Sequence, residues 1–150
     1  MKLSVIDRIT AILLCITFVA GFAFLFFIPR IIPMMFTPKP IPAQGFARAL
    51  FLGCWYVGVL CGLSIIVVLL KMINSIKGDP FIKANVRRLW LLGVLALVIV
   101  FATGFAYFLS FRVLLLLLTV AELLCALFAF VLCAVFKRAV EYRDENALVI

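Results

Sequence analysis

The sequence predicts an all-α, polytopic membrane protein with four transmembrane helices arranged as two antiparallel hairpins. Of its 150 residues, 69% are hydrophobic and only 13% are charged, and the mean hydropathy is +1.38. A chain of this composition lacks the polar residues that a globular protein needs to cover its core in water. Its basic residues fall mostly between long apolar segments, as expected when the bilayer is the solvent.

The first predicted span is residues 9–28, and a proline-rich loop follows it. Twenty uncharged residues make a helix of about 30 Å, which matches the hydrocarbon thickness of a bilayer. A signal peptide would have a shorter apolar core and a small-residue cleavage site, so we interpret this segment as an uncleaved span. Five of the six prolines lie in Pro29–Gly45, which predicts an irregular, partly polyproline-like loop. Its apolar piece, Ile31–Phe36, is expected in the head-group interface or packed over the helix ends.

Small residues mark candidate packing faces on the second and fourth spans. The second span, residues 49–70, contains Gly58 and Gly62, and glycines four residues apart let another backbone approach closely. The fourth span carries a ladder of small residues that includes Ala121, Cys125 and Ala129. We therefore predict close helix contacts at both faces, within this chain or with a second copy in a homo-oligomer.

The central loop, residues 71–88, separates the two predicted hairpins and holds five of the fourteen basic residues. In it, a glycine precedes an aspartate and a proline, the residue types of a turn, an N-cap and a first helical position. This helix-start motif comprises Gly78, Asp79, Pro80, Phe81 and Asn85. It predicts a short cytoplasmic juxtamembrane helix before the third span.

The third and fourth spans, residues 89–110 and 113–136, are joined by Phe111 and Arg112 alone. A connection this short requires adjacent antiparallel helices. The tail, residues 137–150, is charged and is expected to continue the fourth helix at first. The whole chain is therefore predicted to be a single four-helix transmembrane domain.

The distribution of basic residues predicts the orientation. If both termini and the central loop share one side, ten basic residues lie on that side: Lys2, Arg8, Lys71, Lys77, Lys83, Arg87, Arg88, Lys137, Arg138 and Arg143. Four lie on the other: Arg30, Lys39, Arg48 and Arg112. Because short cytoplasmic loops carry the excess of Lys and Arg, both termini are predicted to be cytoplasmic.

Glu122 is the one charged residue of the fourth span and the centre of a candidate intramembrane polar site. A charge inside the bilayer costs about 2.5–3.5 kcal/mol on insertion scales, so such a residue faces the protein interior and finds a partner. The expected hydrogen-bond partners are Thr103, Ser64 or a backbone carbonyl, and Thr119 lies beside Glu122 on the same helical face as a further member of the site. Two roles stay open, namely a structural hydrogen bond between helices and a proton or cation site.

The sequence argues against several classes of function. It has no histidine, and its five cysteines lie inside apolar runs without a C-x-x-C pair. It also lacks a nucleophile elbow, a phosphate-binding loop and paired carboxylates. We expect no enzyme activity, no metal and no cofactor. The basic residues between the spans favour contact with anionic lipid head groups over direct nucleic-acid binding.

Two stretches resemble the signature of a known family. They are Gly78-Asp79-Pro80-Phe81 with Asn85, Arg88-Leu89 and Gly93, and Phe136–Ala139 with Glu145-Asn146 and Leu148. The family is a group of bacterial membrane proteins catalogued as domain of unknown function 2975. The resemblance implies a bacterial inner-membrane protein. Members are often encoded beside a small helix-turn-helix regulator, which the resemblance therefore implies as a partner.

The leading hypothesis is a small inner-membrane regulator or sensor that docks a cytoplasmic helix-turn-helix transcription regulator. The candidate docking residues are Lys83, Arg87, Arg88, Arg138, Glu145 and Asn146. The alternative is a transport or channel component that uses Glu122, and a third hypothesis is an immunity-like protein that shields the membrane. A conduit needs polar groups through the whole bilayer depth, whereas the polar residues here cluster near the middle, which favours the regulator.

Overall fold

The structure, a computed structural model, describes residues 5–35, 45–76 and 82–147. These residues form four α-helices: α1 (Val5–Met35), α2 (Phe46–Ile76), α3 (Lys83–Ser110) and α4 (Val113–Ala147). Each helix contains a window apolar and long enough to cross a membrane. The prediction of an all-α chain with four helices of membrane-spanning length is therefore confirmed.

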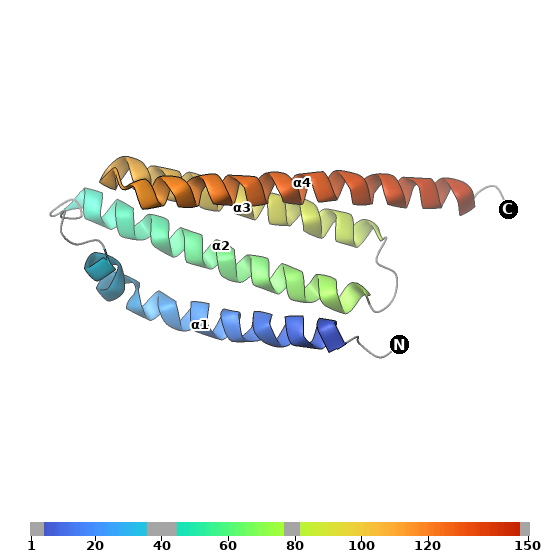
Figure 1. The fold of residues 1–150 in the computed structure, drawn as a ribbon, viewed down its shortest axis with the longest axis horizontal. Helices are drawn as coiled ribbons and strands as arrows, with labels where there is room; N and C mark the ends of the chain where they lie inside the picture. Colours follow the sequence, from blue (N-terminus) through green and yellow to red (C-terminus); the bar gives the residue numbers. More distant parts are fainter. Residues whose placement is uncertain (1–4, 36–44, 77–81, 148–150) are drawn as a thin grey trace.

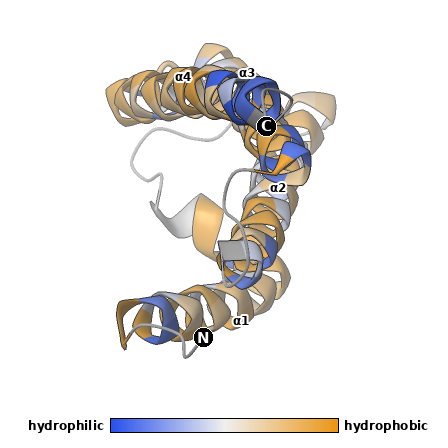
Figure 2. Cartoon of the chain, turned by 90° about the vertical axis from the view of Figure 1, so that its right-hand side faces the viewer, coloured by the Kyte–Doolittle hydropathy of each residue, from blue (hydrophilic) through white to orange (hydrophobic). Residues whose placement is uncertain are grey.

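The helices pack in chain order into one curved layer. Among the described residues, α1 contacts α2, α2 contacts α3 and α3 contacts α4, and no other helix pair brings Cα atoms within 8 Å. Seen end-on, the helices form an open arc with α1 and α4 at its two ends (Figure 2). The start of α1, the end of α2, the start of α3 and the end of α4 lie at one end of the molecule (Figure 1). We call this the terminal end, and the opposite one the turn end.

The surface of the layer is apolar along most of its length. Large side chains such as Phe101 (75% exposed) and Leu117 (62% exposed) point outward, and hydrophilic residues gather at the terminal end (Figure 2). A monomer that exposes so much apolar area is incompatible with water as its solvent. This surface therefore suits the hydrocarbon core of a bilayer.

The proline-rich segment after the first span begins as helix, which corrects the prediction of an irregular loop from Pro29 onward. Helix α1 includes Pro29 and Pro33 and ends at Met35, and its last turns leave the direction of the rest of the helix (Figure 1). Proline lacks an N–H and its ring crowds the carbonyl four residues earlier, so it bends a helix without always ending it. Residues 36–44 lie outside the described part of the chain.

The bend directs two isoleucines into a core at the turn end. Ile28 and Ile32 are completely buried and form a cluster with Phe51 of α2, Ala106 of α3 and Leu115 of α4. Ile32 therefore packs over the helix ends, one of the two positions expected for the apolar piece 31–36. This cluster connects the last turns of α1 to the rest of the layer.

Helix α3 starts later than predicted. Its N-cap is Ile82, whose side chain makes no capping hydrogen bond, and its first residue is Lys83. Gly78, Asp79, Pro80 and Phe81 lie outside the described residues, and the described cap is not Asp79. The described helical part of the central loop is the first turns of α3 itself, continuous with the predicted third span.

The turn between α3 and α4 consists of the two predicted residues. Phe111 adopts the left-handed conformation (φ 49°, ψ 43°) and its N–H donates to the carbonyl of Tyr107 at 2.6 Å. This is the backbone geometry that commonly ends helices, although glycine is the residue that usually adopts it. Its ring stacks edge-on against Tyr107 at a centroid distance of 5.9 Å.

Two glycines form the close helix contacts, and neither belongs to the predicted packing motif. A Cβ added at Gly93 in α3 would lie 2.7 Å from the ring of Phe130 in α4. One added at Gly21 in α1 would lie 3.1 Å from Leu63 in α2. Real Cβ contacts are longer than the first distance, so a side chain at position 93 would force the Phe130 ring or the two helices to shift.

The predicted small-residue faces are not the packing faces of this chain. Nothing lies within 4 Å of a Cβ added at Gly58 or Gly62, and Ala121 and Cys125 are exposed, whereas Ala129 packs against a buried cluster. Among the described residues, the expected close contact is therefore absent at Gly58 and Gly62, and Ala121 and Cys125 are not buried against another helix. Packing of these faces on a second copy stays a prediction.

Candidate functional site

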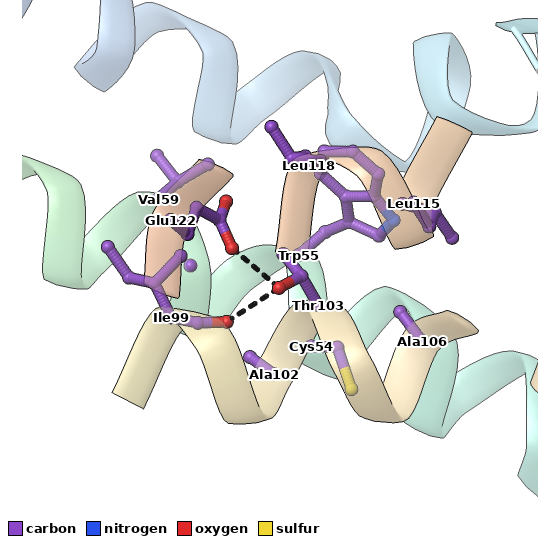
Figure 3. Close-up of a pocket in the computed structure, with 11 residues that line it drawn as sticks. Cys54, Trp55, Val59, Ile99, Ala102, Thr103, Ala106, Leu115, Leu118 and Glu122 are labelled. Atoms are coloured by element: carbon purple, nitrogen blue, oxygen red, sulfur yellow. Dashed lines mark hydrogen bonds between the residues drawn. The ribbon is translucent and has the colours of Figure 1, made fainter. Parts of the chain in front are cut away.

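A cavity of about 230 Å³ lies between α2, α3 and α4, inside the apolar spans (Figure 3). Its lining is mostly apolar, with the carboxyl group of Glu122 and the hydroxyl group of Thr103 among it. The lining residues are Cys54, Trp55, Gly58 and Val59 of α2, Ile99, Ala102, Thr103 and Ala106 of α3, and Leu115, Leu118 and Glu122 of α4. Gly58 contributes no side chain, which leaves part of this space open. Apolar cavities with a few convergent polar groups are typical small-molecule sites.

Three of the predicted polar residues meet at the α3–α4 contact. Thr103 Oγ1 donates a hydrogen bond to Glu122 Oε2 at 2.6 Å. Thr119 Oγ1 lies 3.3 Å from Thr103 Oγ1 and 2.7 Å from the carbonyl oxygen of Leu115. Glu122, Thr103 and Thr119 therefore form one hydrogen-bonded cluster that bridges the two helices.

The number of protons in this cluster constrains its chemistry. The Thr103 hydroxyl also lies 3.0 Å from the carbonyl oxygen of Ile99, yet it has one proton to donate. An ionised Glu122 only accepts, so Thr103 would then satisfy either the carboxylate or the carbonyl. A protonated Glu122 can donate to Thr103 Oγ1 while Thr103 donates to Ile99, and both bonds are made. The geometry thus accommodates a neutral carboxyl group without loss of a hydrogen bond.

Ser64, one of the alternative partners expected for Glu122, does not join this cluster. Its side chain is exposed and its hydroxyl donates to the carbonyl oxygen of Leu60, one turn earlier in α2, at 2.9 Å. Sequence reasoning instead missed Cys54, Trp55 and Val59, the α2 side chains that line the cavity with the carboxyl group (Figure 3). The rotation of α2 decides which of its residues face α4, and no local pattern encodes that rotation.

A second polar cluster ties the end of α2 to the start of α3. Arg88 Nη1 donates to the carbonyl oxygen of Lys71 at 3.2 Å and to Asn85 Oδ1 at 2.9 Å. Asn85 is only 1% exposed. Asn85 was predicted to belong to a helix start and Arg88 to a docking surface. Both therefore help to hold α2 and α3 together.

Helices α3 and α4 stay paired at the terminal end, beyond the fourth span. Lys83 Nζ lies 3.1 Å from Asp144 Oδ2, which joins the first residue of α3 to the charged part of α4. Val140 is only 3% exposed, and Cys133 Sγ lies 3.4 Å from the carbonyl oxygen of Val86. Helix α4 continues through the tail as expected, so the start of α3 and the end of α4 together form a charged projection.

The remaining docking candidates lie on the outside of this projection. Arg87, Arg138, Glu145 and Asn146 are exposed. Tyr142, which the sequence analysis did not single out, is 67% exposed. Arg138, Tyr142 and Glu145 are spaced four and three residues apart and so share one face of α4. We call these three residues the α4 face.

The cysteines form no disulfide and no metal site within the described residues. All five are free thiols, and no group of three His, Cys, Asp or Glu side chains lies close enough to hold a metal ion in the described ranges.

Four long apolar helices, an apolar outer surface and charge at the helix ends define the class as a small multi-pass membrane protein. The chain matches the model of the family described as "Protein of unknown function (DUF2975)" over residues 9–150. It therefore belongs to this family, as the signature residues predicted. No curated protein and no solved structure shows a significant match to the chain.

Proposed function

We propose that this protein is a bacterial inner-membrane regulator or sensor, without enzyme activity, that binds a soluble cytoplasmic protein. Its four helices would cross the membrane as two antiparallel hairpins with both termini in the cytoplasm. The observation that carries the proposal is the paired projection of α3 and α4 at the terminal end, held by the 3.1 Å contact between Lys83 and Asp144.

The projection has the properties of a binding surface rather than of a solvated tail. Eleven residues of α4 follow the fourth span, Lys137–Ala147, and they extend about 16 Å as a helix. Lys83 and Val86 of α3 lie beside the first turn of this extension, where Val140 is buried, so this turn is supported before a partner binds. A preorganised surface loses little conformational entropy when a partner binds.

The α4 face supplies the residue types that dominate protein interfaces. Tyrosine and arginine are enriched among the residues that contribute most binding energy, and Tyr142 stands between Arg138 and Glu145 on an exposed face. The family resemblance favours a helix-turn-helix regulator as the partner. Holding such a regulator at the membrane would let a change in the membrane domain alter its access to DNA.

Photocrosslinking from the α4 face tests this proposal. With p-benzoylphenylalanine in place of Tyr142, we expect a crosslink to a helix-turn-helix protein in native membranes, identified by mass spectrometry. The control is the same probe at Phe108, which is 67% exposed at the turn end.

The charge-reversal variant Arg138→Glu in the probe background should lower the crosslink yield about tenfold, as is typical for an interface hot spot. Arg48→Glu, the same change at the exposed start of α2, should leave it unchanged. Equal yields from both probes, or equal effects of both charge reversals, would contradict the proposal.

The orientation has its own test. In a cysteine-free background, single cysteines at Ser75 and Asn146 should resist an impermeant thiol reagent in intact cells, while one at Arg48 should react. The reason is the excess of ten basic residues over four on the side of the termini. Reaction at Ser75 and protection at Arg48 would reverse the orientation and remove the α4 face from the cytoplasm.

A second candidate function, a transport or channel component, is favoured by one observation. Glu122 lines the cavity between α2, α3 and α4 and bonds to Thr103 at 2.6 Å. Ionisable groups inside membrane spans often mark proton or ion pathways. The described lining is otherwise mostly apolar, which favours the structural role of the carboxyl group.

A further inference from the structure

A groove of about 510 Å³ lies between the end of α2 and the start of α3, at the terminal end. It is separate from the Glu122 cavity and from the α4 face. The side chains that line it are Val68 and Lys71 of α2 and Lys83, Ala84, Arg87, Arg88 and Leu91 of α3. Four of the seven are basic and none is acidic, so the groove is built for an anion.

Most of these basic side chains have no acidic partner among the described residues. Lys83 pairs with Asp144 at 3.1 Å. Lys71 and Arg87 form no salt bridge with any described residue, and the hydrogen bonds of Arg88 go to neutral oxygens, those of Lys71 and Asn85. With respect to the described residues, the groove therefore retains three uncompensated positive charges. The connecting sequence 77–82 contains one lysine and one aspartate, which add no net charge.

One end of the groove is apolar, and it points toward the spans. Val68 lies one helical turn from Lys71, and Leu91 lies one turn from Arg87, both on the membrane side of the basic residues. Trp90, which is 54% exposed, neighbours Leu91 in the sequence. Because tryptophan side chains concentrate at the head-group level of membranes, the basic residues belong at the depth of lipid phosphates.

We propose that this groove binds one anionic phospholipid, with its phosphate on Lys71, Arg87 and Arg88 and an acyl chain along Val68 and Leu91. Basic pockets between transmembrane helices are known to suit such head groups. Three uncompensated charges match a lipid with two phosphates better than a lipid with one. The expected ligand is therefore a diphosphatidylglycerol (cardiolipin), with phosphatidylglycerol weaker and phosphatidylcholine not bound.

Native mass spectrometry of the full chain in detergent with added cardiolipin, phosphatidylglycerol or phosphatidylcholine tests the site. The variant Lys71→Gln/Arg87→Gln should lower cardiolipin binding about tenfold or more. The matched control Arg8→Gln/Lys137→Gln removes the same charge from exposed residues at the same end. Titrations at about 0.15 M ionic strength screen charges beyond about 8 Å, so the control should bind cardiolipin as the wild type does.

A steric variant keeps the test independent of charge and of folding. Ala84 is exposed and lines the groove, so Ala84→Trp should fill it, reduce cardiolipin binding and leave the lipid-free unfolding temperature unchanged. Arg88 is left intact because it holds α2 to α3. Equal losses in the groove and control variants would overturn the proposal, as would unchanged binding in both groove variants. Tighter binding of inorganic pyrophosphate than of cardiolipin to the wild type would instead identify a soluble phosphate as the ligand and overturn the lipid assignment.

Discussion

Replacing Gly93 with leucine is expected to destabilise the folded protein by about 1–3 kcal/mol, the usual cost of overpacking a close contact. Even a Cβ at this position would lie 2.7 Å from the Phe130 ring, so α3 and α4 must separate or the ring must move. Either change loosens the helix pair that carries both the Glu122 cluster and the charged projection. The measurement is unfolding in detergent, followed by tryptophan fluorescence.

The matched control for this prediction is Gly62→Leu. Nothing lies within 4 Å of a Cβ at Gly62, and substitutions without such a contact usually change stability by less than about 0.5 kcal/mol. Phe130→Ala, which removes the ring, should recover part of the lost stability in the Gly93→Leu background. The reason is that the stability effects of substitutions at two residues in contact are not additive. If Gly93→Leu and Gly62→Leu prove equally harmless, the close contact between α3 and α4 is wrong.

Substitution of Glu122 should separate the two candidate functions. Glu122→Gln keeps a group that can donate to Thr103 Oγ1, so it should fold with wild-type stability. Glu122→Leu removes the bond and should cost about 0.6–2 kcal/mol, the range found for interhelical bonds in membranes. Thr103 keeps its contact with the Ile99 carbonyl at 3.0 Å, which places the expected cost at the lower end.

The functional readout is proton and cation flux in liposomes. A regulator should conduct neither in the wild type nor in the Gln variant. A transporter should lose its flux in Glu122→Gln at unchanged stability, because only the titratable group is removed. Flux in the wild type that vanishes in a stable Gln variant would replace the regulator proposal with the transport one.

Thr103→Val should lower stability further than Thr17→Val. The Thr17 hydroxyl is exposed and, among the described residues, bonds only to the Leu13 carbonyl of its own helix.

Part of the candidate site was predictable because a short turn determines which residues of the two joined helices lie at the same level along the helix axes. Phe111 and Arg112 join two antiparallel helices, so residues equally far from the turn lie at similar levels. Thr103 precedes Phe111 by eight residues and Thr119 follows it by eight, and the two hydroxyl groups lie 3.3 Å apart. The cost of an unpaired carboxyl group in a bilayer then brings Glu122 to the same contact.

The sequence alone determined those properties that each segment has independently of its neighbours. Length and apolar content make four helices that suit a bilayer, and the family signature in residues 78–93 and 136–148 identifies the family. The tertiary structure decided how each helix is rotated about its axis. It placed Gly93 rather than Gly58 or Gly62 in close contact with a neighbouring side chain, and it left Ser64 outside the polar cluster. The physical reason is that a helix with apolar residues on all sides has no preferred face in an apolar solvent, so only the fit against neighbouring helices selects one.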